Sequence, residues 1–320
     1  MKNRLGWPDK RVVPIYLLFL LSFCGCAREP DPIVVDFHKT LPQNKPARPS
    51  APSLRVAVGA MVSPKETFIH YQQLFEFIGR KIDSPVELIQ RKTYLEINQL
   101  LDRGEIDIAF ICSGPYAGNK EEYGFQTLAV PQVQNSHFYR SYLIVNANKP
   151  FQRLEDLRGR VFAFTDPESN TGRLAPTFWL HQMKERPETF FSKSIYTYSH
   201  DNSILAVGRG LVDGAAVDSL VWDYLQNTRP ELTRSIRIIR KSEPFAIPPV
   251  VASREFSKEK MDRVRQILLS MHLDEEGRRI LKGLMIDRFI APPADWFENA
   301  EEIQKRTTLL KGDPHVPKKP

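Results

Sequence analysis

The chain has 320 residues, with 45 Lys and Arg against 38 Asp and Glu and a formal net charge of +7 at pH 7. Its basic residues are dispersed and are not interleaved with aromatic residues, which excludes the composition typical of a nucleic-acid-binding protein. Three cysteines are too few for a fold that depends on a disulfide framework.

The N-terminus has the pattern of an export signal. Four basic residues and one acid precede an almost wholly apolar run, Val12–Phe23, which is too short to span a membrane as a stable helix. The segment Leu20–Cys26 resembles a bacterial lipobox. It departs from that pattern at Phe23, where an aliphatic residue is usual, and at Cys24, where a small residue is usual.

This resemblance predicts a lipoprotein signal peptide over residues 1–25, with Cys26 as the lipidated residue; a plain signal peptide or an uncleaved anchor is the alternative. Removing four basic residues and one acid would lower the net charge from +7 to +4, which suits an anionic ligand or membrane surface. Residues 26–53 hold six prolines and no apolar period, which predicts a semi-extended tether. Cys112 would remain as an unpaired, buried thiol.

From residue 54 onward, strands alternate with helices. Capped or amphipathic segments such as Tyr94–Leu101 predict the helices. Such alternation predicts an α/β fold with doubly wound, parallel sheets. Short apolar runs predict strands at Leu54–Met61, Val86–Ile89, Ile106–Ile111, Tyr142–Val145, Val161–Phe164, Ile195–Tyr198, Ala215–Val217 and Ile236–Ile239.

The folded part, residues 54–310, exceeds the usual size of a single core, so two lobes are expected. Crossing strands at 142–146 and 242–253 would form a two-strand hinge between the lobes, and a solvated basic tail would follow. Ligands of such sheets bind beyond the carboxyl ends of the strands, which places the site in the cleft between the lobes. The predicted limits are 54–143 plus 245–310 for lobe one, 147–240 for lobe two and 311–320 for the tail.

The segment Thr165–Pro176 is the strongest functional signal. It follows the apolar run Val161–Phe164 and opens a helix, so Ser169-Asn170-Thr171-Gly172 presents backbone N–H groups and hydroxyls at a helix start. With the positive end of the helix dipole behind them, these donors favour binding of a tetrahedral oxyanion. The alternative is an ordinary N-cap, because Ser, Thr and Asn are preferred there for structural reasons.

Asp166–Pro176 resembles the Asp-Pro-x-Ser-Thr-Ser-Gly-x-Leu-x-Pro signature of the phosphonate-, phosphite- and phosphate-binding periplasmic proteins. These are the solute receptors of ABC importers. The resemblance covers nearly all of 54–290, and it implies two hinged lobes of the type II periplasmic-binding-protein kind that close on a small phosphorus oxyanion. Further segments resemble the family's motifs in the same order: Gly104–Phe110, Tyr139–Asn146, Tyr198–Ser203 and Val212–Ser219.

The resemblance also implies ligand-binding residues. Ser169, Asn170 and Thr171 would hold the anion from the helix start, with Asn170 standing where the family usually has Thr or Ser. Asn still offers two donors, so the change bears on ligand identity more than on anion binding. Tyr94 and Tyr139 match positions of ligand-facing phenols; the alternative for both is packing of an aromatic at a lobe edge.

Two further residues complete the predicted site. His200 follows a strand and would donate to an oxyanion, with its pKa raised by the negative charge; the alternative is a surface-loop histidine. Asp218 ends a strand and would favour a protonated phosphorus oxyacid over sulfate; the alternative is a helix cap. Ser113 could add a donor.

The expected function is that of a binding protein without cofactor, metal or catalytic residue. No P-loop, His-x-x-x-His pair or activated thiol is present in the sequence. The expected partners are a phosphorus oxyanion, an ABC permease and ATPase, and a bacterial membrane reached through the lipid, with the protein itself a monomer on the periplasmic or cell-surface side. The alternatives are a receptor for a sulfonate or another small solute, a ligand sensor without transport, and a phosphoester hydrolase using His200 and Asp201.

Overall fold

The computed structural model describes residues 53–59 and 64–311. The predicted signal peptide, Cys26, all of the tether but Ser53, and all of the predicted tail but Lys311 lie outside the described residues; Lys311 is the last residue of helix α10. Within the described part, no helix combines the length and the apolar character needed to cross a membrane.

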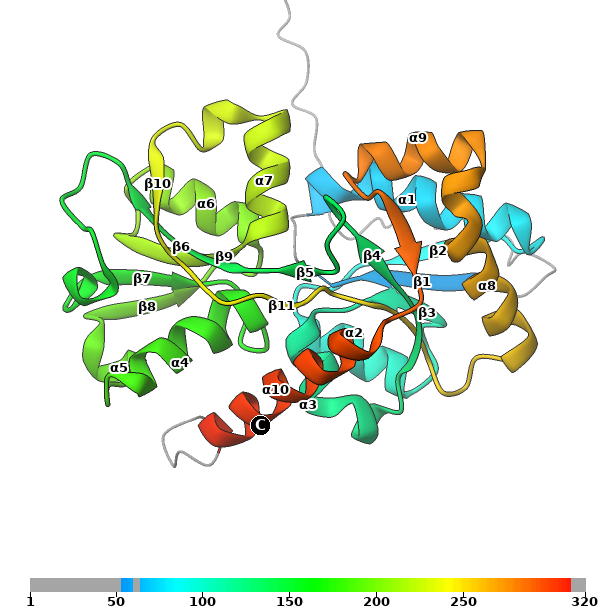
Figure 1. Cartoon of the computed structure of the whole chain (residues 1–320), viewed down its shortest axis with the longest axis horizontal. Coiled ribbons are helices and arrows are strands. Elements are labelled where there is room, and N and C mark those ends of the chain that lie inside the picture. Colours follow the sequence, from blue (N-terminus) through cyan, green and yellow to red (C-terminus); the bar gives the residue numbers. More distant parts are fainter. Residues whose placement is uncertain (1–52, 60–63, 312–320) are drawn as a thin grey trace, which may run out of the picture. The chain divides into compact units, whose positions relative to one another are not determined.

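The first sheet has six strands in the order β13–β4–β12–β3–β1–β2 (Figure 1). β1 runs parallel to β2 and β3, whereas β12 runs antiparallel between β3 and β4, and β13 runs antiparallel to β4. The strands are β1 (Leu54–Val58), β2 (Val86–Ile89), β3 (Ile108–Phe110), β4 (Gln126–Gln132), β12 (Val250–Ala252) and β13 (Arg288–Ile290).

The second sheet has five strands in the order β10–β6–β9–β7–β8. β7 runs parallel to β8 and β9, and β6 runs antiparallel to β9 and β10. Both sheets are therefore mixed and not wholly parallel as predicted, because β6 and β12 enter from the hinge without a crossover helix. The strands are β6 (Ser141–Asn146), β7 (Val161–Phe164), β8 (Lys193–Tyr196), β9 (Gly214–Asp218) and β10 (Ile236–Lys241).

Two short paired strands join the sheets. β5 (Phe138–Tyr139) pairs antiparallel with β11 (Phe245–Ala246), and the chain passes through them from β4 to β6 and back from β10 to β12. The predicted two-strand hinge is thus present: β5 lies a few residues before the predicted strand 142–146, and β11 lies within the predicted segment 242–253. The predicted lobe boundary at residue 143 falls inside β6, since Tyr142 and Leu143 pair with β9 in the second sheet. Only Arg140 separates β5 from β6, so the sequence pattern does not mark where the chain changes sheets.

Helices cover both faces of each sheet. α1, α8 and α9 pack on one face of the first sheet, and α6 and α7 pack on one face of the second. A third cluster joins the remaining face of each sheet to α2, α3, α4 and α10, so one apolar core continues from lobe to lobe. The helices are α1 (Pro64–Lys81), α2 (Tyr94–Asp102), α3 (Ser113–Tyr123), α4 (Ala175–Gln182), α5 (Pro187–Phe190), α6 (His200–Gly208), α7 (Ser219–Thr228), α8 (Lys258–Ser270), α9 (Glu275–Gly283) and α10 (Ala294–Lys311), with short turns η1 (Leu154–Leu157), η2 (Asn170–Leu174), η3 (Pro230–Leu232) and η4 (Met271–Leu273).

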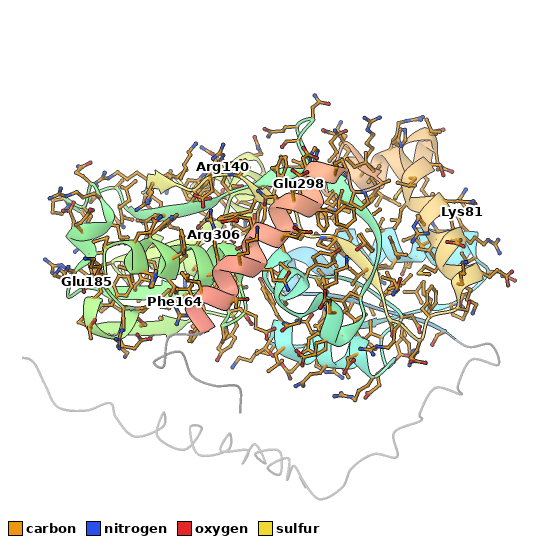
Figure 2. The ribbon with its side chains drawn as sticks, turned by 60° about the horizontal axis from the view of Figure 1, so that its bottom comes forward. Lys81, Arg140, Phe164, Glu185, Glu298 and Arg306 are labelled. Atoms are coloured by element: carbon orange, nitrogen blue, oxygen red, sulfur yellow. The ribbon has the colours of Figure 1, made fainter. Side chains whose placement is uncertain are left out.

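The C-terminal helix α10 contacts both lobes. Its Trp296 is fully buried, packs edge-to-face against Tyr116 with ring centroids 5.1 Å apart, and donates from Nε1 to the Ile247 carbonyl at 3.1 Å. Further along the same helix, Arg306 (Figure 2) lies 4.6 Å from the centroid of the Phe178 ring of lobe two. Because α10 buries apolar surface against both lobes, the lobes can separate from each other only on the side away from this helix.

Candidate functional site

The predicted site residues lie where strand ends and helix starts of the two lobes meet. Tyr94 begins α2 after β2, Asn170 begins η2 after β7, His200 begins α6 after β8, and Asp218 ends β9. Tyr139 belongs to the hinge strand β5. Helix N-termini that point to one region together favour negative charge there.

The turn Ser169–Gly172 is shaped by local packing. The Ser169 hydroxyl accepts a hydrogen bond from the Gly172 N–H at 3.0 Å, so Ser169 is an N-cap. A Cβ on Gly172 would lie 2.5 Å from the Cβ of Thr165, so the close approach of turn and strand end requires glycine. The Ser141 hydroxyl of β6 donates to the Thr171 carbonyl at 2.7 Å and holds the turn from the hinge side.

Asn170 joins the two lobes. Its Nδ2 donates to Ser113 Oγ and to Tyr139 Oη, both at 3.3 Å, and these two hydroxyls are 2.7 Å apart. A Cβ on Gly114 would lie 2.6 Å from the Glu168 carbonyl oxygen, so the start of α3 packs directly against this loop of lobe two. The Asn170 amide, which stands where the family usually has a Thr or Ser hydroxyl, therefore lies where the two lobes meet.

Unpaired polar atoms gather at this place. Among the described residues, five buried side-chain nitrogen or oxygen atoms lack a hydrogen-bond partner, and only His272 Nδ1 lies outside the predicted site. Each such atom costs about 1–3 kcal/mol when no partner is supplied, so four at one location indicate a place where a ligand supplies partners. The four atoms are Tyr94 Oη, Asn170 Oδ1, Thr171 Oγ1 and His200 Nε2.

His200 is buried and is not a surface-loop residue. Its Nδ1 accepts a hydrogen bond from the Asp218 backbone N–H at 3.1 Å and lies 3.1 Å from Thr165 Oγ1. Since a backbone amide only donates, Nδ1 carries no proton and the neutral ring carries it on Nε2. Without a ligand, burial lowers the pKa of His200 to about 3, because desolvation disfavours the charged ring. The predicted rise in pKa concerns His200 beside a bound anion and stays a prediction.

Asp218 caps a helix and has a raised pKa. Its Oδ1 accepts from the Leu220 N–H at 2.7 Å and caps α7. A helix cap is the alternative role that the sequence predicted for this residue. Burial raises its pKa to about 7, against the effect of the Leu220 and Val221 amides. Burial raises the pKa values of Tyr94 and Tyr139, and the negative charge of Asp218 adds to this effect.

Both tyrosines are buried and protonated. Burial raises the pKa of Tyr94 and of Tyr139 well above the ordinary value, so each hydroxyl remains a donor at neutral pH. The Tyr94 backbone N–H donates to Asp166 Oδ2 at 3.2 Å, which ties the start of α2 to the loop of lobe two. Burial raises the pKa of that carboxyl to about 6.

The structure thus brings the seven predicted residues together and adds others that sequence analysis assigned no role or only a minor one. Asp166 stands in the motif, but its contact lies 72 positions away at Tyr94. Thr165 contacts His200 across 35 positions, and Ser113, expected only to add a donor, meets Tyr139 across 26. Spacing along the chain carries no sign of such contacts; a polar residue next to a strand end is the only available signal.

Two α/β lobes joined by paired strands, with buried polar groups where their strand ends meet, have the architecture of the two-lobed periplasmic binding proteins. One solved structure of that class is PhnD1 from Prochlorococcus marinus (MIT 9301) in complex with methylphosphonate, which superposes with a TM-score of 0.72 at 18% identity and covers 80% of this chain and 98% of that one. At this identity the similarity shows the fold alone. The family follows from the sequence: the chain belongs to the ABC transporter, phosphonate, periplasmic substrate-binding proteins, whose family model matches residues 56–297.

Curated relatives of the chain carry different ligand names. The probable ABC transporter phosphite binding protein PhnD1 of Prochlorococcus marinus (strain MIT 9301) is 22% identical over 58% of this chain and 66% of its own length. The phosphonates-binding periplasmic protein of Escherichia coli (strain K12) is 26% identical over 50% and 47%, respectively. The phosphate-import protein PhnD of Mycolicibacterium smegmatis (strain ATCC 700084 / mc(2)155) is 25% identical over 65% and 69%. The chain matches less than two thirds of the length of the first two.

Proposed function

We propose that this protein is a lipid-anchored, extracytoplasmic solute-binding protein that captures a small phosphorus oxyanion, namely a phosphonate, phosphite or phosphate, and delivers it to an ABC importer. Family membership supports the class, and the relatives' names (phosphite, phosphonates and phosphate) support the ligand range. The anchor on Cys26 and the monomeric state stay predictions from the sequence.

One observation carries the proposal: three buried donors from three separate elements have no partner among the described residues. They are the hydroxyl of Tyr94 in α2, the hydroxyl of Thr171 in η2, and the Nε2–H of His200 in α6. A hydrogen bond to a charged acceptor contributes about 1.5–3 kcal/mol, and a tetrahedral oxyanion offers several such acceptors. Neutral donors of this kind bind an anion without a permanent counter-charge in the site.

The amide of Asn170 can contribute a fourth donor. Its unpaired Oδ1 and its bonded Nδ2 are exchanged by a half-turn of the amide, after which Oδ1 accepts from one of the two hydroxyls of Ser113 and Tyr139 while the other donates between them. Nδ2 then points where Oδ1 now points. The residue that departs from the family's signature is in this way compatible with an anion.

The carboxyl group of Asp218 favours a phosphorus oxyacid over sulfate or a sulfonate as the ligand. A carboxyl group with a pKa of about 7 is part-protonated at neutral pH and can share a proton with a phosphorus oxyacid that still holds one. Sulfate and sulfonates carry no proton at that pH and would meet a partly charged carboxylate. The same fold with a sulfonate ligand is therefore the less favoured alternative.

The geometry of His200 argues against hydrolysis. An acid–base catalyst works best with a pKa near the working pH, whereas burial lowers the pKa of His200 to about 3. Its Nδ1 is already bonded to the Asp218 amide. Turnover of a chromogenic phosphoester by the purified protein, abolished in a His200→Ala variant, would establish an enzyme instead.

The decisive experiment is isothermal titration calorimetry with phosphite, phosphate, methylphosphonate, 2-aminoethylphosphonate, sulfate and a sulfonate. We expect at least one phosphorus species to bind, and Thr171→Val to weaken it by about 10–100-fold, since the change removes one donor to a charged ligand. Thr308→Val is the matched control, because Thr308 is exposed on α10 and bonds only to the Gln304 carbonyl among the described residues. Binding of a sulfonate without any phosphorus species would refute the assignment.

A further inference from the structure

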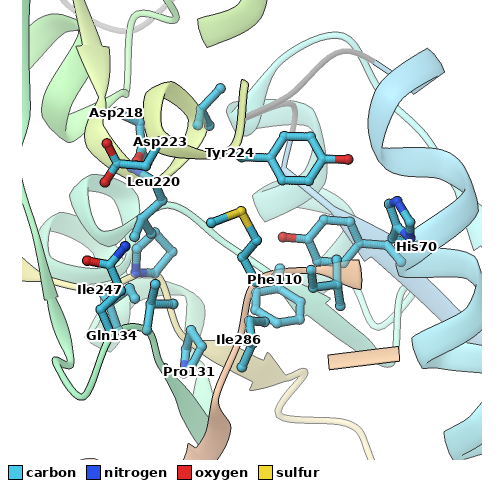
Figure 3. A pocket seen from close by; sticks show the side chains of 16 residues that line it. His70, Phe110, Pro131, Gln134, Asp218, Leu220, Asp223, Tyr224, Ile247 and Ile286 are labelled. Carbon is cyan, nitrogen blue, oxygen red and sulfur yellow. The ribbon is translucent and has the colours of Figure 1, made fainter. Parts of the chain in front are cut away.

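A cavity opens between the lobes, and Asp218 is among the residues that line it (Figure 3). It has a volume of about 100 Å³ and a mostly apolar lining. Leu220 and Tyr224 of α7 surround the same space as Phe110 and Ile286 of lobe one. A water molecule needs about 10–15 Å³ of such space, so the cavity holds several groups of that size, such as a short hydrocarbon chain or a ring.

The cavity adjoins the anion-binding residues through Asp218. This residue lines the cavity, and its backbone N–H bonds His200. Its charge also contributes to the raised pKa values of Tyr71, on the cavity side, and of Tyr94, on the anion side. Tyr71 lies against Phe110 at the end of β3, with ring centroids 5.2 Å apart.

The other side of the anion-binding residues is closed by packing. Asn170, Ser113 and Tyr139 are bonded to one another across the lobes, and Gly114 has no room for a Cβ against Glu168. A substituent carried by a bound oxyanion cannot extend in that direction. The apolar cavity on the Asp218 side offers the space.

We propose that this cavity binds the uncharged alkyl or aryl substituent of an organophosphonate whose phosphonate oxygens are held by Tyr94, Thr171 and His200. This inference rests on the proposed function and narrows its ligand class from any small phosphorus oxyanion to one with an apolar group. We name the cavity the substituent pocket.

The charges at the substituent pocket disfavour an anionic substituent. Asp218 and Asp223 both line it and would repel a second anionic group on the ligand. Burial raises the pKa of Asp223, while the positive charge of Lys241 acts in the opposite direction, so this carboxyl already has a cation nearby. Tyr71, Phe110 and Tyr224 instead offer ring surfaces against which an apolar chain or ring packs.

The test is calorimetry of the full chain with phosphite and with methyl-, propyl-, phenyl- and 3-aminopropylphosphonate. Each methylene that leaves water raises affinity by about fourfold, so propylphosphonate, with two more methylenes, is expected to bind about 15-fold more tightly than methylphosphonate. Phenylphosphonate is expected to gain at least as much. The aminopropyl compound is expected to bind more weakly than the propyl compound, because its ammonium group must lose water.

The Leu220→Gln variant tests whether the substituent of the ligand binds in the substituent pocket. We expect it to weaken propylphosphonate binding by about fivefold and to change methylphosphonate binding by less than about twofold. Leu211→Gln makes the same change on an exposed residue of lobe two, where Leu211 is 69% exposed, and should leave both affinities unchanged. Retained methylphosphonate binding shows that the Leu220 variant is folded.

Three results would overturn the inference: affinity that stays level or falls from methyl to propyl to phenyl, an equal loss of both ligands in Leu220→Gln, or tighter binding of the aminopropyl compound. If phosphite and methylphosphonate bind while the longer ligands do not, the proposed function stands and the substituent pocket is wrong. If no phosphorus compound binds, both fail.

Discussion

Helix starts in this protein use the same residue types for two different purposes. At the start of α2, Thr93 and Glu96 form a capping box on the surface: Thr93 Oγ1 accepts from the Glu96 N–H, and Glu96 accepts from the Thr93 N–H at 2.9 Å. At the start of η2, Ser169 caps the turn, but Asn170 and Thr171 keep buried atoms without partners among the described residues. A helix start is thus a candidate site when its polar groups are buried and unpaired, and not merely because Ser, Thr or Asn is present.

Two aspartate caps show the same contrast in charge. Asp218 caps α7 inside the protein, and burial raises its pKa to about 7. Asp274 caps α9 at the surface, and hydrogen bonds from the Gly277 amide and Lys81 lower its pKa. The exposed carboxylate stabilises the fold in its charged form, whereas the buried carboxylate stabilises it only when protonated.

The largest predicted effect is on the pH dependence of stability through Asp218. Below its unfolded-state pKa of about 3.9 the residue is protonated in both states; between that value and about 7 the folded chain retains a proton that the unfolded chain has lost. The free energy of unfolding should therefore fall by about 3 kcal/mol between pH 5 and pH 8 on account of this residue. Asp218→Asn keeps a capping oxygen and should remove that fall in urea denaturation.

Asp274→Asn is the control for this prediction. Because its folded-state pKa is lowered, Asp274 contributes stability above its unfolded pKa and loses it only as the pH falls through the lower folded value. The substitution should leave the change between pH 5 and pH 8 as in the wild type. An equal pH dependence in wild type and in Asp218→Asn would show that this carboxyl does not titrate near neutrality.

The next largest effect concerns the shape of the turn. A methyl group on Gly172 would meet the side chains of Thr165 and Ser169, so Gly172→Ala should destabilise the protein by about 1–3 kcal/mol and abolish oxyanion binding. Gly208→Ala is the control, because a Cβ there meets its nearest neighbour, Ile236, at an ordinary 3.4 Å. Thermal unfolding and calorimetry on both variants measure the two effects. Wild-type binding in Gly172→Ala would disprove the close packing of this turn.

The sequence allowed more of the fold than of the site to be predicted, for a physical reason. β7 coincides with its predicted limits, 161–164, because a buried strand between turn residues carries its own apolar signal. The first hinge strand was predicted a few residues late and the second only as part of a longer segment, because β5 and β11 have two residues each and no period of their own. The tautomer of His200 depends on the Asp218 amide 18 positions away, and burial by both lobes decides it.

A smaller effect is expected at the capping box, where a substitution should change stability but not ligand affinity. Thr93→Ala removes two exposed hydrogen bonds of Thr93 Oγ1, one accepted from the Glu96 N–H and one donated to the Glu96 carboxylate. The change should cost about 1 kcal/mol of unfolding free energy, with no change in ligand affinity. Chemical denaturation and calorimetry on the same sample separate the two quantities. A loss of affinity would mean that the capping box of Thr93 and Glu96 also takes part in binding, and the contrast between this cap and the start of η2 would fail.

The smallest predicted change in stability is also the most specific. Thr171→Val removes a buried hydroxyl that has no partner among the described residues and replaces it with a methyl group of similar size. In the absence of ligand the variant should be as stable as the wild type or more stable by a few tenths of a kcal/mol, because no hydrogen bond is lost and less polar surface is buried. With ligand present, the wild type should gain about 2.7 kcal/mol at a hundredfold excess over Kd, and the variant much less at the same concentration. A residue kept for structure loses stability when it is replaced, whereas one kept for a ligand loses only the stabilisation that the ligand supplies. Destabilisation of the ligand-free protein by Thr171→Val would therefore assign Thr171 to the fold and remove it from the site.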